Sequence, residues 1–298
     1  MRYLSFTDPS GVDRAGVLSA DGRVRAVGDT PRAAGDPSPM RAAIMAAGSP
    51  GIEADGPEFA LDDIAWLPAI PDPSKVVAAP VNYRDHQAEM SQDAHIDALG
   101  VFLKAPSSVL AHGGVVRLPY DDRRFDQEGE FAAVIGRTAS HVSAADALDH
   151  VFGYTSLLDM TMRGGEDRST RKSFDTFTPV GPTIVTRDEV EDIDALELSL
   201  WVNGTLRQRA DLADLIWGLP ELISYASSVM TLLPGDVVTT GTPAGVGQVF
   251  DGDRIELEIT GLDRLAVSVS AVGAVPCPTR GANLGPRPPE TLTPVFPR

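Results

Sequence analysis

Short runs of apolar residues, most of them bounded by glycine, proline or aspartate, fill the chain from residue 75 to about 273. Polar and apolar positions alternate over 254–259 and 265–270, which predicts two half-buried strands. The segments 196–202 and 205–209 flank Asn203-Gly204, a pair typical of a type I′ hairpin turn. The segment 129–137 has an uncharged, β-branched and aromatic centre, so we expect a strand that enters the core.

Helical periodicity is clear in one segment. Apolar residues recur at spacings of three and four between Leu215 and Met230, which predicts a helix with Pro220 in its first turn. Ser143 is a suitable N-cap for a second helix over 143–151. Because hairpins outnumber strand–helix–strand units, we expect a mixed α/β fold dominated by β-structure rather than a doubly wound sheet.

The two ends of the chain differ from this central region. Apolar segments on either side of Ala20-Asp21-Gly22 predict a hairpin, and Ser38-Pro39 predicts a short helix that ends at Gly48. Prolines crowd 49–74, which predicts an irregular connector, and the proline-rich 276–298 predicts a tail or a docked arm. We therefore divide the chain into a small N-terminal α+β unit with its connector (1–74), a larger strand-rich domain (75–275) and the tail (276–298).

Composition and charge narrow the possible partners. The 298 residues are 43% hydrophobic and carry a formal net charge of −17, which argues against nucleic acid or an anionic membrane as the partner. A single cysteine, Cys277, excludes an internal disulfide and multi-cysteine metal sites. The uncharged stretch 222–235 is too short to span a bilayer, and the first residues lack a secretory pattern. We expect a cytoplasmic globular protein, and the negative net charge does not argue against a small anionic substrate.

Three acidic residues are candidate metal ligands. Glu128 and Glu130 are two apart on the predicted strand, so their side chains share a face, and Asp159 follows an apolar run and could end a neighbouring strand. Together they would bind a hard cation, Mg²⁺ or Mn²⁺ first and Ca²⁺ next. The alternative is a solvated edge where Arg123 and Arg124 neutralise the two glutamates, with Asp159 as a capping residue.

Other segments carry weaker signals. If 82–89 is helical, His86 and Glu89 share a face, and a histidine oriented by a carboxylate can act as a general base; the alternative is a solvent-facing turn. Lys172 could bind a substrate carboxylate or stabilise a developing enolate near a metal; the alternative is a surface lysine. The glycine-rich 239–247 lacks the P-loop and dinucleotide patterns, so we expect a tight turn and no nucleotide cofactor.

The order of these motifs resembles the fumarylacetoacetate hydrolase family across about residues 75–270. The resemblance rests on the segments NYRDHQAE (82–89), FLK (102–104), GEFAAVIG (129–136), GYT (153–155), DMTMR (159–163), KSFDTFTPVGP (172–182), VNG (202–204), PGD (234–236) and TGTPAGVG (240–247). It implies a β-sandwich roll, usually dimeric. It also implies Mg²⁺ or Mn²⁺ held by Glu128, Glu130 and Asp159, a His86–Glu89 dyad and an active-site lysine, Lys172. On the same motifs we assign substrate contacts to Tyr83, Lys104, Arg163, Gly241 and Thr242.

The resemblance also implies a reaction class. Family members act on 2-oxo acids and 1,3-dicarbonyl compounds, so we expect C–C bond hydrolysis of an acylpyruvate through an enolate stabilised by the metal. The alternatives are a decarboxylase or tautomerase of 2-oxo or 2-hydroxy-dienoic acids on the same site, and a non-catalytic acid-binding member. The segment between Asp159 and Lys172, with Gly164 after Arg163, departs from the common pattern. Because this segment is expected beside the pocket, it bears on which substrate is bound.

Overall fold

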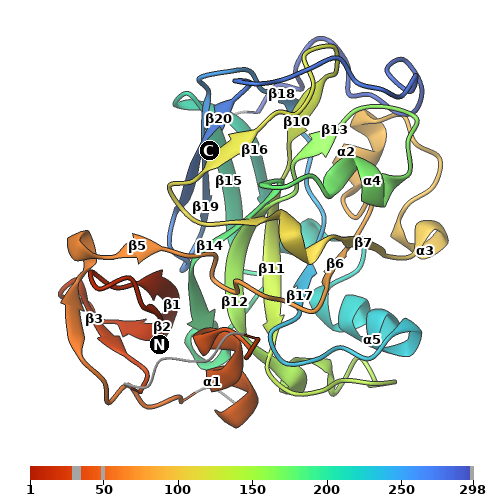
Figure 1. Cartoon of the computed structure of the whole chain (residues 1–298). Helices are drawn as coiled ribbons and strands as arrows, with labels where there is room; N and C mark the ends of the chain where they lie inside the picture. The colour runs from red at the N-terminus through yellow and green to blue at the C-terminus, as the bar shows by residue number, and fades with distance from the viewer. Residues whose placement is uncertain (29–34, 48–50, 296–298) are drawn as a thin grey trace.

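The computed structural model describes residues 1–28, 35–47 and 51–295. Three sheets make up most of the fold (Figure 1). The largest has the strand order β4-β3-β2-β1-β14-β12-β11-β17-β6-β7, with β5 on β1 and β8 on β14. Its strands are β1 (Arg2–Thr7), β2 (Asp13–Leu18), β3 (Arg23–Ala26), β4 (Glu58–Ala60), β5 (Ala65–Trp66), β6 (Val76–Ala78), β7 (Phe102–Lys104), β8 (Val109–Leu110), β11 (Gly129–Ile135), β12 (Val151–Leu158), β14 (Thr178–Thr186) and β17 (Val237–Thr239).

Two smaller sheets complete the β-structure of the described residues. The order β16-β15-β19-β20-β9 joins Thr205–Asp211, Glu197–Val202, Arg254–Ile259, Leu265–Ser270 and Val115–Arg117. The order β13-β10-β18 joins Thr161–Met162, Phe125–Gln127 and Gly247–Gln248. The α-helices are α1 (Pro39–Ala47), α2 (Arg84–Glu89), α3 (Ile96–Leu99), α4 (Arg168–Lys172) and α5 (Leu219–Val229), with short 3-10 turns at Leu61–Asp63, Pro106–Ser108, Ala147–His150, Arg187–Glu189 and Leu212–Asp214.

Strand β11 is buried on both faces, which explains its lack of charge after Glu130. Phe131, Ala133 and Ile135 face the core shared with the five-stranded sheet and α5. Ala132 and Val134 face a second core, which includes Tyr3 of β1 and Ile44 of α1. The N-terminal strands continue the same sheet, because β1 pairs with β14. β11 therefore lies inside the large sheet, between β12 and β17 (Figure 1).

Most of the predicted elements are present. The 129–137 strand is β11, the Asn203-Gly204 hairpin joins β15 to β16 with positive φ at both turn residues, and the two alternating segments are β19 and β20. The hairpin at 20–22 joins β2 to β3, and the helix after Ser38 is α1, although its predicted end at Gly48 lies outside the described residues. The β-dominated mixed fold is confirmed, and parallel pairs such as β6–β17 accompany the hairpins.

The predicted helix with Pro220 in its first turn is α5, which begins at Leu219, and Leu215 before it bridges to Tyr83. Two predicted elements were wrong in whole or part. The helix over 143–151 is a turn at Ser143, then a 3-10 turn, and Val151 begins β12. The connector 49–74 is not wholly irregular, since β4 and β5 add to the N-terminal strands.

The proline-rich tail has neither helix nor strand over 276–295. It lies against the strand-rich part of the chain, where the guanidinium of Arg123 donates to the backbone and side chain of Thr279. Among the described residues, no helix has the length and apolar character needed to cross a membrane.

Candidate active site

Three buried carboxylates meet at one end of the β11–β12 pair. Glu130 is the second residue of β11, Glu128 directly precedes that strand, and Asp159 directly follows β12. The strands are antiparallel, and the Asp159 amide donates to the Glu128 carbonyl at 2.8 Å, so the start of one strand lies beside the end of the other. Oxygens of the three carboxylates lie within 4.8 Å of one another, and no residue of the three is more than 4% exposed. The fold thus brings together all three predicted ligands.

Two lysines contact this cluster. The ammonium of Lys172 donates to Glu128 at 2.6 Å and also to Asp159, and it is 6% exposed rather than on the surface. Lys104, which is fully buried, donates to Asp159 and to the carbonyl of Phe177. Burial lowers the pKa of Lys104, and the charge of Asp159 opposes this effect. The charge of Asp159 therefore helps to keep Lys104 protonated.

The lysines do not balance the negative charge of the cluster. Burial and the neighbouring Asp159 raise the pKa of Glu130 from its ordinary value near 4.5 to about 8. In Glu128, burial also favours the neutral form, but Lys172 and Arg163 outweigh it and lower the pKa. The donors of the cluster are carboxylate oxygens, which suit a hard dication such as Mg²⁺ or Mn²⁺. The residues fit such an ion, which would relieve the repulsion that Glu130 experiences.

The solvated-edge alternative does not hold in this structure. Arg123 pairs with Glu166 and Arg124 with Asp126, both at 2.8 Å, and neither reaches the predicted glutamates. Arg163 instead donates to Glu128 at 2.7 Å and to Asp126 at 2.6 Å. The sequence analysis missed Asp126, a fully buried residue. Its position two residues before Glu128 continues the alternation of acidic residues, a signal that could have identified it.

His86 and Glu89 form a hydrogen-bonded pair on α2. His86 Nδ1 lies 2.9 Å from Glu89 Oε2, as the spacing of three residues on a helix predicts. The other Glu89 oxygen accepts from the Gly245 amide at 2.9 Å and from the Thr293 hydroxyl at 2.5 Å. Burial favours a neutral Glu89, but these hydrogen bonds outweigh it and lower its pKa. A carboxylate held in this way fixes the orientation of the His86 ring through Nδ1. The second ring nitrogen, Nε2, makes no hydrogen bond to another described residue.

The glycine-rich loop 239–247 donates hydrogen bonds both to Glu130 of the carboxylate cluster and to Glu89 of the His86–Glu89 pair. The Gly241 amide donates to Glu130 at 3.1 Å, and the hydroxyl of Thr239 donates to the same carboxylate. Gly241 has φ +86°, and a Cβ there would lie 3.0 Å from Pro80 O. Gly245 has φ +100°, and a Cβ would lie 1.7 Å from Arg207 O. The segment between β17 and β18 is an irregular loop rather than the expected tight turn, and its glycines let the backbone approach its neighbours.

A substitution at Gly245 tests this interpretation of the loop. We expect Gly245→Ala to lower the free energy of unfolding by more than about 2 kcal/mol, because it adds a backbone clash to an unfavourable φ. Gly252→Ala is the matched control, since Gly252 has φ +85° and open space around its Cβ direction; a loss of about 1 kcal/mol is expected there. Urea denaturation of both variants gives the comparison. Equal losses would contradict the close approach to Arg207.

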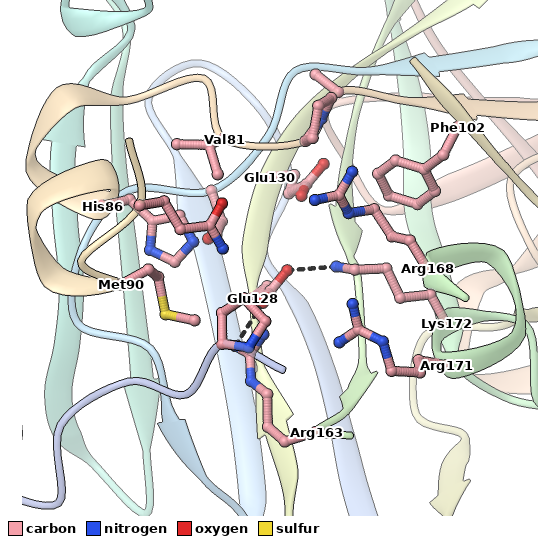
Figure 2. Close-up of a pocket in the computed structure, with 15 residues that line it drawn as sticks. Val81, His86, Met90, Phe102, Glu128, Glu130, Arg163, Arg168, Arg171 and Lys172 are labelled. Carbon is pink, nitrogen blue, oxygen red and sulfur yellow. Dashed lines mark hydrogen bonds and ion pairs between the residues drawn. The ribbon is translucent and has the colours of Figure 1, made fainter. Parts of the chain in front are cut away.

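A pocket opens above the carboxylates. Glu128 and Glu130 lie at its centre, with His86, Met90 and Val81 on one side and Arg168, Arg171 and Lys172 on the other (Figure 2). Phe102 lies beside Arg168 on that second side. Pro286 of the tail also lines the pocket. The predicted general base and the predicted lysine thus face each other across the carboxylates.

The residues predicted to contact substrate fall into two groups. Arg163 and Thr242 line the pocket, whereas Tyr83, Lys104 and Gly241 do not. Lys104 donates to Asp159 and the Gly241 amide donates to Glu130, but neither residue lines the pocket. The lining therefore does not support a direct contact of either residue with the substrate. The Tyr83 hydroxyl is buried without a hydrogen-bond partner among the described residues, and its contact with substrate stays a prediction.

Besides Asp126, sequence reasoning missed three contributors to the site. Arg168 and Arg171 line the pocket from α4, and their spacing of three with Lys172 next to Arg171 was the available signal. Thr293 in the tail bonds Glu89 across 204 positions of sequence, and no local pattern indicates that contact.

Comparison with known proteins agrees with this geometry. The family model described as "Fumarylacetoacetate (FAA) hydrolase C-terminal" matches residues 75–270. The chain is 44% identical over 229 residues to maleylpyruvate hydrolase of Aquipseudomonas alcaligenes, covering 73% of this chain and 80% of that protein. It is 38% identical to oxaloacetate tautomerase YisK of Bacillus subtilis, covering 70% and 74%.

A solved structure is similar over most of the chain. The crystal structure of maleylpyruvate hydrolase from Sphingobium sp. SYK-6 in complex with manganese(II) and pyruvate has a TM-score of 0.76 and 37% identity, covering 91% of this chain and 99% of that one. The match extends well beyond the residues of the family model. The chain therefore belongs to the fumarylacetoacetate hydrolase family.

Proposed function

We propose that the protein is a divalent-metal-dependent hydrolase that cleaves a C–C bond in acylpyruvates of the maleylpyruvate or fumarylpyruvate type. The observation that carries this proposal is the buried cluster of Glu128, Glu130 and Asp159 facing the His86–Glu89 pair across one pocket. The relatives named maleylpyruvate hydrolase, one of them solved with manganese and pyruvate, support it.

The three carboxylates would hold Mg²⁺ or Mn²⁺. Such an ion supplies Lewis-acid polarisation of a 2-oxo acid and stabilises negative charge on its enolate. The manganese in the similar structure favours Mn²⁺, and the hard oxygen donors accept Mg²⁺ equally well. Ca²⁺ also suits carboxylate oxygens and could take the same place in crystals.

The chain's own residues account for the proton transfers. Glu89 accepts the Nδ1–H of His86, so Nε2 can take a proton from a water molecule in the pocket. The resulting hydroxide attacks the acyl carbonyl, the C–C bond to the pyruvate methylene breaks, and its electron pair forms the enolate of pyruvate. The proton on Nε2 then returns to that methylene carbon. Lys172, at the pocket edge, offsets the negative charge that develops. The products are pyruvate and one carboxylic acid.

Identification of products tests the proposal. With Mn²⁺ present, fumarylpyruvate is expected to give one equivalent each of pyruvate and fumarate, and turnover is expected to disappear after dialysis against EDTA and return with Mn²⁺ or Mg²⁺. Chromatography separates the acids. Turnover that persists in the metal-free protein would contradict the role given to the carboxylate cluster.

Isomerisation is the second candidate activity. Similarity to oxaloacetate tautomerase YisK favours it, because proton transfer between carbon and oxygen needs the same polarised 2-oxo acid but no water attack. Decarboxylation shares that requirement. The same product assay separates the three, since it yields two acids, an isomer of the substrate, or CO₂.

Assembly and location are proposed from the family resemblance. We expect a homodimer in the cytoplasm that takes a small oxo acid as its substrate and no nucleic acid or membrane partner. Light scattering on the purified chain tests the dimer, and a mass of one chain, 31.5 kDa, would contradict it.

A further inference from the structure

Helix α4 presents three cationic side chains on one face. Arg168, Arg171 and Lys172 stand at positions i, i+3 and i+4, which share a face of a helix. The helix is short, and the carboxylate of Asp167 caps it by accepting from the Ser169 amide at 2.8 Å. All three side chains line the pocket and point toward its centre (Figure 2). The face of α4 thus forms a cationic wall.

Two of these cations have no carboxylate partner among the described residues. Arg171 is held by backbone carbonyls, of Glu166 at 2.9 Å and Met162 at 3.4 Å. Arg168 has no hydrogen-bond or ion-pair partner in the part of the chain that the structure describes, and its guanidinium lies 5.6 Å from the centre of the Phe102 ring. Arg163, in the same pocket, pairs with two carboxylates. A partly buried guanidinium without a counterion is costly, so the pair indicates a place for an anion.

The charge of the pocket lining supports this inference. Four cations line it, Arg163, Arg168, Arg171 and Lys172, against two carboxylates, Glu128 and Glu130. A divalent ion at the carboxylates would add to the positive excess. Burial is the largest cause of a lowered pKa in Arg168 and Arg171, and repulsion from Arg163 adds to it in Arg171. A ligand with a second negative charge compensates both guanidinium groups better than a monoanion does.

We propose that Arg168 and Arg171 form a subsite for a second carboxylate, which makes the site selective for dianionic 2-oxo acids. The subsite rests on the proposed function in one respect: the first carboxylate and its 2-oxo group are taken to face the Glu128–Glu130–Asp159 cluster. Arg171, fixed by two backbone carbonyls, supplies the oriented donor, and Arg168, stacked near Phe102, supplies the second. The guanidinium fork matches a carboxylate through paired N–H donors.

A matched pair of substrates tests the subsite. Fumarylpyruvate and crotonylpyruvate have the same carbon skeleton and differ by a terminal carboxylate against a methyl group. We expect Arg168→Gln and Arg171→Gln each to lower kcat/KM for the dianion by roughly tenfold to a hundredfold, the size of a charge-assisted hydrogen bond. Crotonylpyruvate is expected to change less than about threefold by the same reasoning. Arg117→Gln, at an exposed strand position, is the control for loss of a positive charge.

Binding without turnover separates this inference from the proposed function. Calorimetry on the Mn²⁺-loaded protein compares 2-oxoadipate with 2-oxohexanoate, and repeats the comparison without metal. A preference for 2-oxoadipate that disappears in the arginine variants supports the subsite even if no acylpyruvate is hydrolysed. Equal losses for both ligands would place the arginines at the shared 2-oxo carboxylate and overturn the inference, whereas hydrolysis could continue. Unchanged affinity for both would overturn it as well.

Discussion

Replacing Glu130 by glutamine is expected to remove Mn²⁺-dependent turnover, lowering kcat/KM by about a thousandfold or more, because several kcal/mol of charge stabilisation depend on the ion. Glutamine keeps an oxygen that can accept from Gly241 and Thr239, so the fold around the cluster is preserved while one anionic ligand is lost. Titration calorimetry with Mn²⁺ and initial rates on fumarylpyruvate measure the two effects. Glu256→Gln on β19, outside the pocket, is the control and should leave both unchanged.

Glu130→Gln should impair turnover, but it should make the stability of the metal-free fold less sensitive to rising pH. The pKa of Glu130 rises from about 4.5 to about 8 on burial beside Asp159, so the folded protein retains a proton that the unfolded chain has lost. The stability that this proton contributes is complete below pH 4.5 and is lost as the pH rises through about 8. In Glu130→Gln this fall should be absent. Urea denaturation at several pH values in EDTA measures the free energy of unfolding of both proteins. If this free energy changes with pH in the same way in both, the raised pKa of Glu130 is contradicted.

Local pattern predicted the fold where a strand or turn is determined by its own residues. Asn203 and Gly204 both adopt positive φ angles readily, so the hairpin turn depends little on its surroundings. The residues after Glu130 in β11 carry no charge, so burial of the strand could be predicted from them alone. The helix over 143–151 failed because Val151 to Leu158 pairs with β11 and β14, and tertiary pairing outweighs the capping preference of Ser143. Helix α5 formed where its periodicity predicted it, with Pro220 in the first turn, the part of a helix that tolerates proline.

The site could be predicted only as far as its residues lie on recognisable motifs. Glu128, Glu130 and Asp159 are near strand ends that the pattern located, so their convergence followed from one antiparallel pairing. The pairing of Arg163 with Asp126 depends on the short β10–β13 pair, and the contact of Thr293 with Glu89 depends on the docked tail. Both contacts join segments far apart in the sequence, so a local pattern can mark a residue such as Asp126 without indicating its partner.

Replacing His86 by alanine is expected to lower kcat for acylpyruvate hydrolysis by about a hundredfold to ten-thousandfold, the range of general-base catalysis. Affinity for Mn²⁺ should remain, because His86 bonds Glu89 and not the carboxylate cluster. Imidazole added to this variant is expected to restore part of the rate, since the substitution leaves space for a ring beside Glu89. Single-turnover rates with and without imidazole measure the restoration.

Glu89 extends this test to the orientation of the ring. Glu89→Gln keeps the size of the side chain but replaces the carboxylate that accepts from His86, Gly245 and Thr293, so kcat should fall while imidazole gives no rescue. Thr293→Val removes one of these donors and should cause a smaller loss, of about tenfold or less. If His86→Ala hydrolyses acylpyruvates at the rate of the unaltered protein, water activation belongs to another group. The proposed route would then have to be reassigned, although the carboxylate cluster would keep its place in it.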